Sequence, residues 1–116
     1  MKTPGDLLAE WAARFAADVT TLPALYTEDA LFFGSTPPLH RGVAGISAYF
    51  AALPAQPGAA VAFSDVVIET IAEGVASIAA FATFTRGDTA RRLRITLTAV
   101  RRGGAWRFAS HHVSPA

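Results

Sequence analysis

The chain has 116 residues, ten basic and nine acidic side chains, no cysteine, and 52% hydrophobic residues. This length and hydrophobic content predict one domain over residues 1–116 and exclude a disordered tail, while the lack of cysteine excludes disulfides, thiolate metal sites and cysteine nucleophiles. No apolar run reaches the ~18 residues of a membrane span, and the acidic, tryptophan-containing start does not resemble a signal peptide, so we expect a cytoplasmic protein without a membrane partner.

The first half of the chain reads as three helices and one short strand. Thr3 and Pro4 are typical of a helix start, and apolar residues then recur at helical spacing up to Leu22. A second, short helix is predicted to run through residues 25–26, followed by a strand over residues 30–34. Prolines make residues 35–38 a loop. Residues 42–53 form a third predicted helix, and residues 55–58 a linker.

From residue 59 onward the hydrophobic period changes from 3.6 to 2. This period predicts four strands over residues 60–71, 75–86, 89–101 and 105–114, with glycine-containing turns between them. The gaps are too short for crossover helices, so the strands are expected to form an antiparallel meander. Three helices followed by four strands favour an α+β fold with the helices on one face of the sheet.

Alternation assigns side chains to the two faces of this sheet. Leu93, Ile95 and Leu97 are expected to face the helices, and the residues between them to face outward. An outer face rich in aromatic, threonine and arginine residues is typical of a subunit interface, so we expect a homodimer. The predicted interface consists of Phe81, Arg92, Arg94, Thr96, Thr98, Trp106, Phe108 and His112. A solvated sheet face is one alternative. Residues 86–107 hold seven arginines and one acid, which makes nucleic-acid binding another, but the interleaving with apolar residues argues against a nucleic-acid partner.

Three segments in this order resemble the nuclear transport factor 2-like superfamily, and its SnoaL-like and calcium/calmodulin-dependent kinase II association-domain branches in particular. The segments are Leu25-Tyr26-x-x-Asp29-Ala30, Arg41-Gly42-x-x-x-Ile46-x-x-Tyr49-Phe50, and Arg101 to Trp106-x-Phe108-x-x-His111-His112-x-Ser114. The resemblance implies a cystatin-like, cone-shaped α+β barrel in which three helices and a curved, mainly antiparallel sheet enclose a pocket. It leaves activity open, because the fold hosts both enzymes and assembly modules.

The resemblance also marks departures in the pocket. The association domain lines its cone with three arginines, and the matching positions here are Ala82, Leu97 and Val113. A small, neutral, mostly apolar ligand is therefore expected. The ketosteroid isomerase branch carries its catalytic base at the position of Gly34, and the predicted strand 89–101 holds no acid. That mechanism is not supported by the sequence.

His111 is the leading candidate for a catalytic residue. Neighbouring strand residues point to opposite faces, and the alignment with Val113 implies that His111 faces inward and His112 outward. A histidine there could serve as general acid or base, contact a ligand without catalysis, or be a hydrogen-bonded core residue. Asp18 is the predicted carboxylate partner, with a solvated helix-end acid as its alternative. Asp65 could face either side.

The predicted pocket is lined mainly by aromatic residues. Its members are Trp11, Phe15, Tyr26, Phe32, Ile46, Tyr49, Phe50, Ala82, Phe84, Leu97, His111 and Val113. No metal site is expected, because adjacent strand histidines cannot chelate one ion and His40 has no neighbouring acid. No cofactor is expected either. Two functions remain open: an isomerase- or cyclase-type enzyme that transfers a proton on a small apolar carbonyl compound, and a non-catalytic self-association module.

Overall fold

The computed structural model describes residues 1–54 and 57–116, so the first two residues of the predicted linker 55–58 lie outside the described part. Its elements in chain order are α1 (Pro4–Ala17), the 3-10 helix η1 (Val19–Leu25), β1 (Tyr26–Phe33), β2 (Leu39–Arg41), α2 (Gly42–Ala51), β3 (Ala60–Ala72), β4 (Val75–Arg86), β5 (Thr89–Arg102) and β6 (Ala105–Pro115). None of the helices in these ranges is long and apolar enough to cross a membrane.

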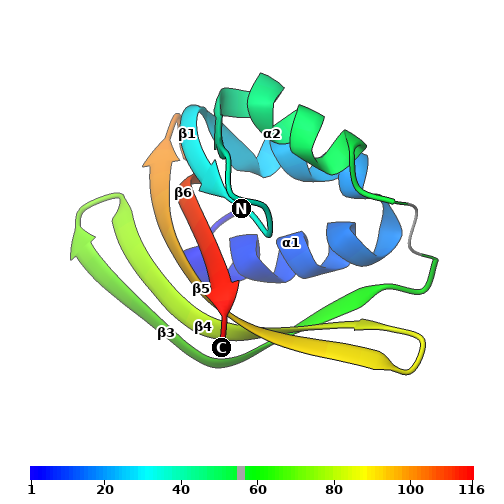
Figure 1. Ribbon diagram of the computed structural model, residues 1–116. Coiled ribbons are helices and arrows are strands. Elements are labelled where there is room, and N and C mark those ends of the chain that lie inside the picture. The colour runs from blue at the N-terminus through cyan, green and yellow to red at the C-terminus, as the bar shows by residue number, and fades with distance from the viewer. Residues whose placement is uncertain (55–56) are drawn as a thin grey trace.

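The six strands form one curved sheet in the order β2-β1-β6-β5-β4-β3. All neighbours are antiparallel except β1 and β6, which pair in parallel. Figure 1 shows α1 and α2 lying on the concave side of this sheet, which stays open at its two edges. The α+β fold predicted from the sequence is confirmed, but the sheet is mixed and does not close into a barrel.

Helix α1 begins as the sequence predicts. The Thr3 hydroxyl accepts a hydrogen bond from the Asp6 amide at 3.0 Å, and Pro4 occupies the first helical turn. Leu7, Leu8 and Trp11 form its buried side. The capped end and the apolar stripe together fix which side chains α1 presents to the sheet.

The segment after α1 differs from its prediction. The short second helix is confirmed as η1, but the chain becomes extended at Tyr26, four residues before the predicted strand. Burial along β1 does not alternate regularly, and its pairing with β6 shifts between Tyr26 and Leu31, so only the second half of the strand carries a period-2 signal. Strand β2 pairs with β1 and has three residues. Three residues are too few to show an alternation of apolar and polar side chains in the sequence.

The long strands confirm the assignment of the inner face. Leu93, Ile95, Leu97 and Ala99 of β5 are buried, as are Ile78, Ala80 and Ala82 of β4. Arg92, Arg94 and Thr96 are exposed on the opposite face. The helices therefore pack on the side that the alternation predicted.

The orientation predicted for Trp106 and Phe108 is wrong. Both lie in the buried core, and the Phe108 ring packs against Tyr26 with 5.6 Å between centroids. The cause is a β-bulge in β6. Thr98 pairs with Ser110 whereas Ala99 pairs with Phe108, so the extra residue Ala109 shifts the alternation by one. Before the bulge the even-numbered residues of β6 face inward. After the bulge the odd-numbered residues face inward.

Candidate functional site

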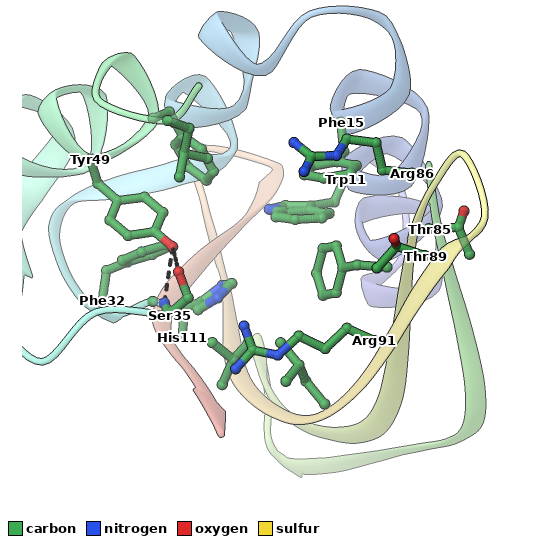
Figure 2. Close-up of a pocket in the computed structure, with 16 residues that line it drawn as sticks. Trp11, Phe15, Phe32, Ser35, Tyr49, Thr85, Arg86, Thr89, Arg91 and His111 are labelled. Atoms are coloured by element: carbon green, nitrogen blue, oxygen red, sulfur yellow. Dashed lines mark hydrogen bonds between the residues drawn. The ribbon is translucent and has the colours of Figure 1, made fainter. Parts of the chain in front are cut away.

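A cavity of about 300 Å³ opens between the helices and the concave face of the sheet. Figure 2 shows its walls, with Phe32 and Tyr49 on one side, Trp11 and Phe15 on another, and His111 between them. The residues that line it are Trp11, Phe15, Phe32, Gly34, Ser35, Tyr49, Phe50, Leu53, Phe84, Thr85, Arg86, Thr89, Arg91, Leu93, His111 and Val113. An apolar, aromatic cavity with a few polar groups is typical of a small-molecule site.

A buried hydrogen-bond chain lies behind this cavity. The Trp11 indole donates from Nε1 to the Tyr26 hydroxyl at 2.9 Å, and the same hydroxyl lies 2.9 Å from Nδ1 of His111. The three residues come from α1, the start of β1 and β6, which are distant in the sequence. The chain therefore joins one helix to two adjacent strands at the floor of the cavity.

Donor counting fixes the tautomer of His111. Trp11 can only donate, so the Tyr26 oxygen accepts from it, and the single hydroxyl proton remains for His111. If Nδ1 carried a proton, the buried Tyr26 hydroxyl would have no acceptor, which is costly. Nδ1 thus accepts, and the proton of the neutral imidazole lies on Nε2. No described residue forms a hydrogen bond with Nε2, which leaves it available to a molecule in the cavity.

Burial keeps both ionisable members of the chain neutral. Desolvation lowers the pKa of His111 from 6.5 to about 3, and the nearby His112 lowers it further in the same direction. Desolvation also raises the pKa of Tyr26 above its ordinary range, although the hydrogen bond from Trp11 opposes this. Near neutral pH the site thus presents an uncharged N–H donor, not an imidazolium acid.

Aromatic rings hold His111 in place. Phe32 stacks on its ring with centroids 4.2 Å apart and planes 25° apart. On the other wall Trp11 stacks on Phe15 at 5.3 Å, and Phe15 meets the edge of Phe84 at 5.2 Å. The cavity therefore has two flat aromatic surfaces, one of which carries the polar group.

Gly34 is required by the close approach of Tyr49. A Cβ atom on Gly34 would lie 2.4 Å from the Tyr49 ring, far inside contact distance. The Tyr49 hydroxyl accepts from the Ser35 amide at 2.9 Å and contacts the Ser35 hydroxyl at 2.8 Å, which fixes the rim at this point. A carboxylate side chain at position 34, as in the isomerase branch, has no room unless Tyr49 moves.

The predicted carboxylate partner of His111 is not in the cavity. Asp18 is exposed and caps η1, where it accepts from the Thr20 amide at 3.0 Å and the Thr20 hydroxyl at 2.6 Å. These hydrogen bonds lower the pKa of its carboxyl group. A residue that ends one helix and starts the next serves the backbone, so the proposed acid/base pair is wrong. Asp65 is also exposed, at a bulge in β3 beside Arg92.

Most of the predicted wall residues line the cavity, but four do not. Tyr26, Ile46, Ala82 and Leu97 are buried in the core and are absent from its surface. Tyr26 instead acts through His111. The apolar residues Ala82 and Leu97, which replace arginines of the association domain, therefore pack in the core and do not shape the cavity surface. Val113, the third such position, does line the cavity.

The β4–β5 hairpin supplies a mouth that the sequence interpretation missed. Thr85, Arg86, Thr89 and Arg91 line the cavity at the end where the hairpin turns. The alternation of the strands indicates this position. Arg86 lies on the same face of β4 as Ala82 and Phe84, and Arg91 lies on the same face of β5 as Leu93. The sequence interpretation assigned Arg92 and Arg94 to the outer face and gave no side for Arg86 or Arg91.

Comparison with known proteins agrees with this architecture. The sequence profile of the SnoaL-like domain matches residues 6–116. A proposed calcium/calmodulin-dependent protein kinase II association domain from Xanthomonas campestris superposes with a TM-score of 0.87 at 20% identity, covering 97% of this chain and 84% of that one. Aln2 from a Streptomyces species gives 0.84 at 19% identity, over 96% and 86% of the two chains.

A ketosteroid isomerase candidate from Parabacteroides distasonis gives a TM-score of 0.82 at 18% identity, over 96% of this chain and 83% of that one. At these identities the similarity establishes the fold. No protein with a curated description matches the sequence significantly. Because the profile spans nearly the whole chain, this protein belongs to the SnoaL-like family, and it shares its fold with solved proteins described as nuclear transport factor 2-like.

Proposed function

We propose that the protein binds a small, flat, largely apolar carbonyl compound, with His111 Nε2–H donating a hydrogen bond to the carbonyl oxygen. The observation that carries the proposal is the Trp11–Tyr26–His111 chain, which leaves the Nε2–H of His111 as a free donor between the aromatic walls of the cavity. A site built to donate one hydrogen bond discriminates strongly against ligands that lack the acceptor.

The same geometry limits the chemistry that the site supports. No aspartate or glutamate is among the described residues that line the cavity, so none of them supplies a carboxylate base. His111 is held as a donor and its pKa lies near 3, so it is a poor base in this arrangement. Its role is to polarise the carbonyl and to stabilise negative charge that develops on that oxygen, as in an enolisation or an addition.

The test compares two ligands of the same shape. 2-Acetylnaphthalene carries the carbonyl, and 2-isopropenylnaphthalene replaces its oxygen with carbon. Calorimetry on the wild-type protein should show that the ketone binds about tenfold more tightly, as one desolvated hydrogen bond predicts. The infrared stretch of a carbon-13-labelled carbonyl should shift to lower frequency on binding.

His111→Phe keeps a ring at this position and removes the donor. In this variant the two ligands should bind equally and the carbonyl shift should disappear. Equal affinities for the wild-type protein, or a ketone whose carbonyl stretch stays unshifted when bound, would contradict the proposal without reference to any variant.

A second candidate function is self-association through the outer face of the sheet. The observation that favours it is a row of exposed and half-buried side chains across β1, β6 and β5, in which Phe33 pairs with His112 and His112 with Thr96. Phe33 is 39% exposed and Leu31 is 46% exposed. Phe81 and Arg92 continue this face, with the guanidinium 3.7 Å from the ring centroid. The apolar side chains of this mixed face lose their contact with water when a second copy covers them, which favours association.

Light scattering tests the self-association. The wild-type protein should have the mass of a dimer, and Thr96→Arg, which places a further charge at the centre of this face, should have the mass of a monomer. Ala13→Arg, on the exposed side of α1, is the matched control and should remain a dimer. A monomeric wild-type protein would exclude this function.

A further inference from the structure

The inner face of the β4–β5 hairpin changes from apolar to cationic toward its turn. Phe84 pairs with Arg91, and Arg86 pairs with Thr89, so both arginines lie on the side of the sheet that faces the helices. Both line the cavity together with Phe84 and Leu93. Figure 2 shows them reaching from the hairpin over the cavity, Arg86 on the side of Phe15 and Arg91 on the side of His111.

Neither of these two arginines has a carboxylate partner among the described residues. Arg92, Arg101 and Arg102 each lie within 4.0 Å of a carboxylate. Among the described residues no such ion pair reaches Arg86 or Arg91, and Asp88 in the intervening turn pairs with neither. A cleft lined by one sign of charge, with apolar walls behind it, concentrates ions of the opposite sign.

We propose that the natural ligand is amphipathic and carries a carboxylate or similar anionic group, which Arg86 and Arg91 hold at the mouth while its carbonyl end reaches His111. This inference rests on the proposed function and narrows it to keto acids with a flat, apolar body. Guanidinium groups suit this task because their planar N–H fork matches a carboxylate in two parallel hydrogen bonds. Thr89 pairs with Arg86, so it lies on the same face of the hairpin, and it also lines the cavity.

An anionic ligand differs from the neutral ligand that we expect from the sequence alone. That expectation came from Ala82, Leu97 and Val113, which stand where the association domain carries arginines. Two of those positions do not reach the cavity surface. The two arginines that line the cavity, Arg86 and Arg91, lie nearer the β4–β5 turn than these positions, and their place favours a ligand that is apolar in its middle and charged at its outer end.

The test adds a carboxylate to the ligand used above. 6-Acetyl-2-naphthoate carries the same ketone as 2-acetylnaphthalene and an acidic group at the far end of the rings. Calorimetry on the wild-type protein should give an affinity for the acid roughly tenfold higher than for the ketone. The difference should shrink at high salt, because the pairing takes place at an accessible mouth.

The Arg86→Gln/Arg91→Gln double variant should bind the acid no more tightly than the ketone, and each single variant should lose part of the difference. Arg107→Gln is the matched control, since Arg107 is exposed on β6 and does not line the cavity; this variant should retain the full preference.

Two results would overturn the inference while the proposed function stands. One is equal binding of the acid and the ketone by the wild-type protein, and the other is a preference that survives in the double variant. If the wild-type protein bound neither compound, the proposed function would fail together with this inference.

Discussion

The Tyr26 hydroxyl lies 2.9 Å from Nδ1 of His111, although the two residues are separated by 85 positions in the chain. Parallel pairing of β1 with β6 creates this contact, since Tyr26 aligns with Phe108 and Phe32 with His111. The hydroxyl also accepts from Trp11, which fixes the direction of its own proton. One buried oxygen thus decides which nitrogen of His111 faces the cavity.

Removal of this oxygen should destabilise the protein and change the tautomer. Tyr26→Phe leaves the Trp11 N–H and His111 Nδ1 without a partner in the core, and unpaired buried groups cost about 1–3 kcal/mol. Urea denaturation measures the loss, and nitrogen-15 NMR should show His111 as a mixture of tautomers. Tyr49→Phe is the control, because its hydroxyl bonds to exposed Ser35, and its cost should stay below about 1 kcal/mol. Equal costs for both variants would contradict this account.

The burial of His111 predicts a pH dependence of stability. Its pKa falls from 6.5 to about 3 in the folded state, so below pH 6.5 the unfolded chain binds a proton that the folded protein rejects. The free energy of unfolding is therefore highest above pH 6.5, the pKa of His111 in the unfolded chain. It falls as the pH drops from there toward the folded pKa of about 3, by up to about 1.4 kcal/mol per pH unit.

Urea unfolding of the wild-type protein and of His111→Phe between pH 7 and pH 4.5 measures this slope, over a range chosen to lie above the ordinary carboxylate pKa values of about 4. The slope should be steeper in the wild-type protein. Exposed His112→Gln serves as the matched control and should retain most of it. Parallel curves for the wild-type protein and His111→Phe would show that His111 protonates freely.

Substitution of Gly34 should distort the rim of the cavity. The Cβ of Gly34→Ala would lie 2.4 Å from the Tyr49 ring, and a displaced ring in a packed site costs about 1–3 kcal/mol. Thermal unfolding measures the effect. Because the clash is with Tyr49 alone among the three nearest atoms, the Gly34→Ala/Tyr49→Ala double variant should be more stable than the sum of the single effects predicts.

Gly45→Ala provides the control for this prediction. Its Cβ would meet neighbouring atoms at 3.6 Å or more, an ordinary contact, and alanine favours the helix α2. This variant should be as stable as the wild-type protein or slightly more so. A Gly34→Ala variant that behaves in the same way would mean that Tyr49 has room to move.

Substitution of Phe108 should cost more stability than substitution of Phe81, because the bulge in β6 turns Phe108 into the core whereas Phe81 of β4 lies on the outer face. Phe108 is fully buried against Tyr26, so Phe108→Ala should cost about 3–5 kcal/mol. Phe81 lies half-buried on the outer face beneath Arg92, and Phe81→Ala should cost less than half as much in the monomer. Chemical denaturation at low protein concentration separates the two. Similar losses would place Phe108 on the outer face after all.

The class of the fold and the two faces of the central strands follow from local features of the sequence. The change from a 3.6 to a 2 period after residue 59, the capped start at Thr3 and the glycine turns are local features, and each follows from neighbouring residues. The alternation of Leu93, Ile95 and Leu97 likewise assigns a side to β5 without any knowledge of its neighbours. Whether the outer face joins two copies stays a prediction.

Tertiary structure alone decided the features that depend on pairing between distant segments. The bulge at Ala109 shifts the alternation of β6 and moves Trp106 and Phe108 into the core, yet nothing in the local pattern marks the extra residue. The parallel pairing of β1 with β6 places Tyr26 beside His111. Asp18 caps η1 and therefore does not contact His111. The direction of a side chain is local, but its partner is set by register, and register is a property of two strands together.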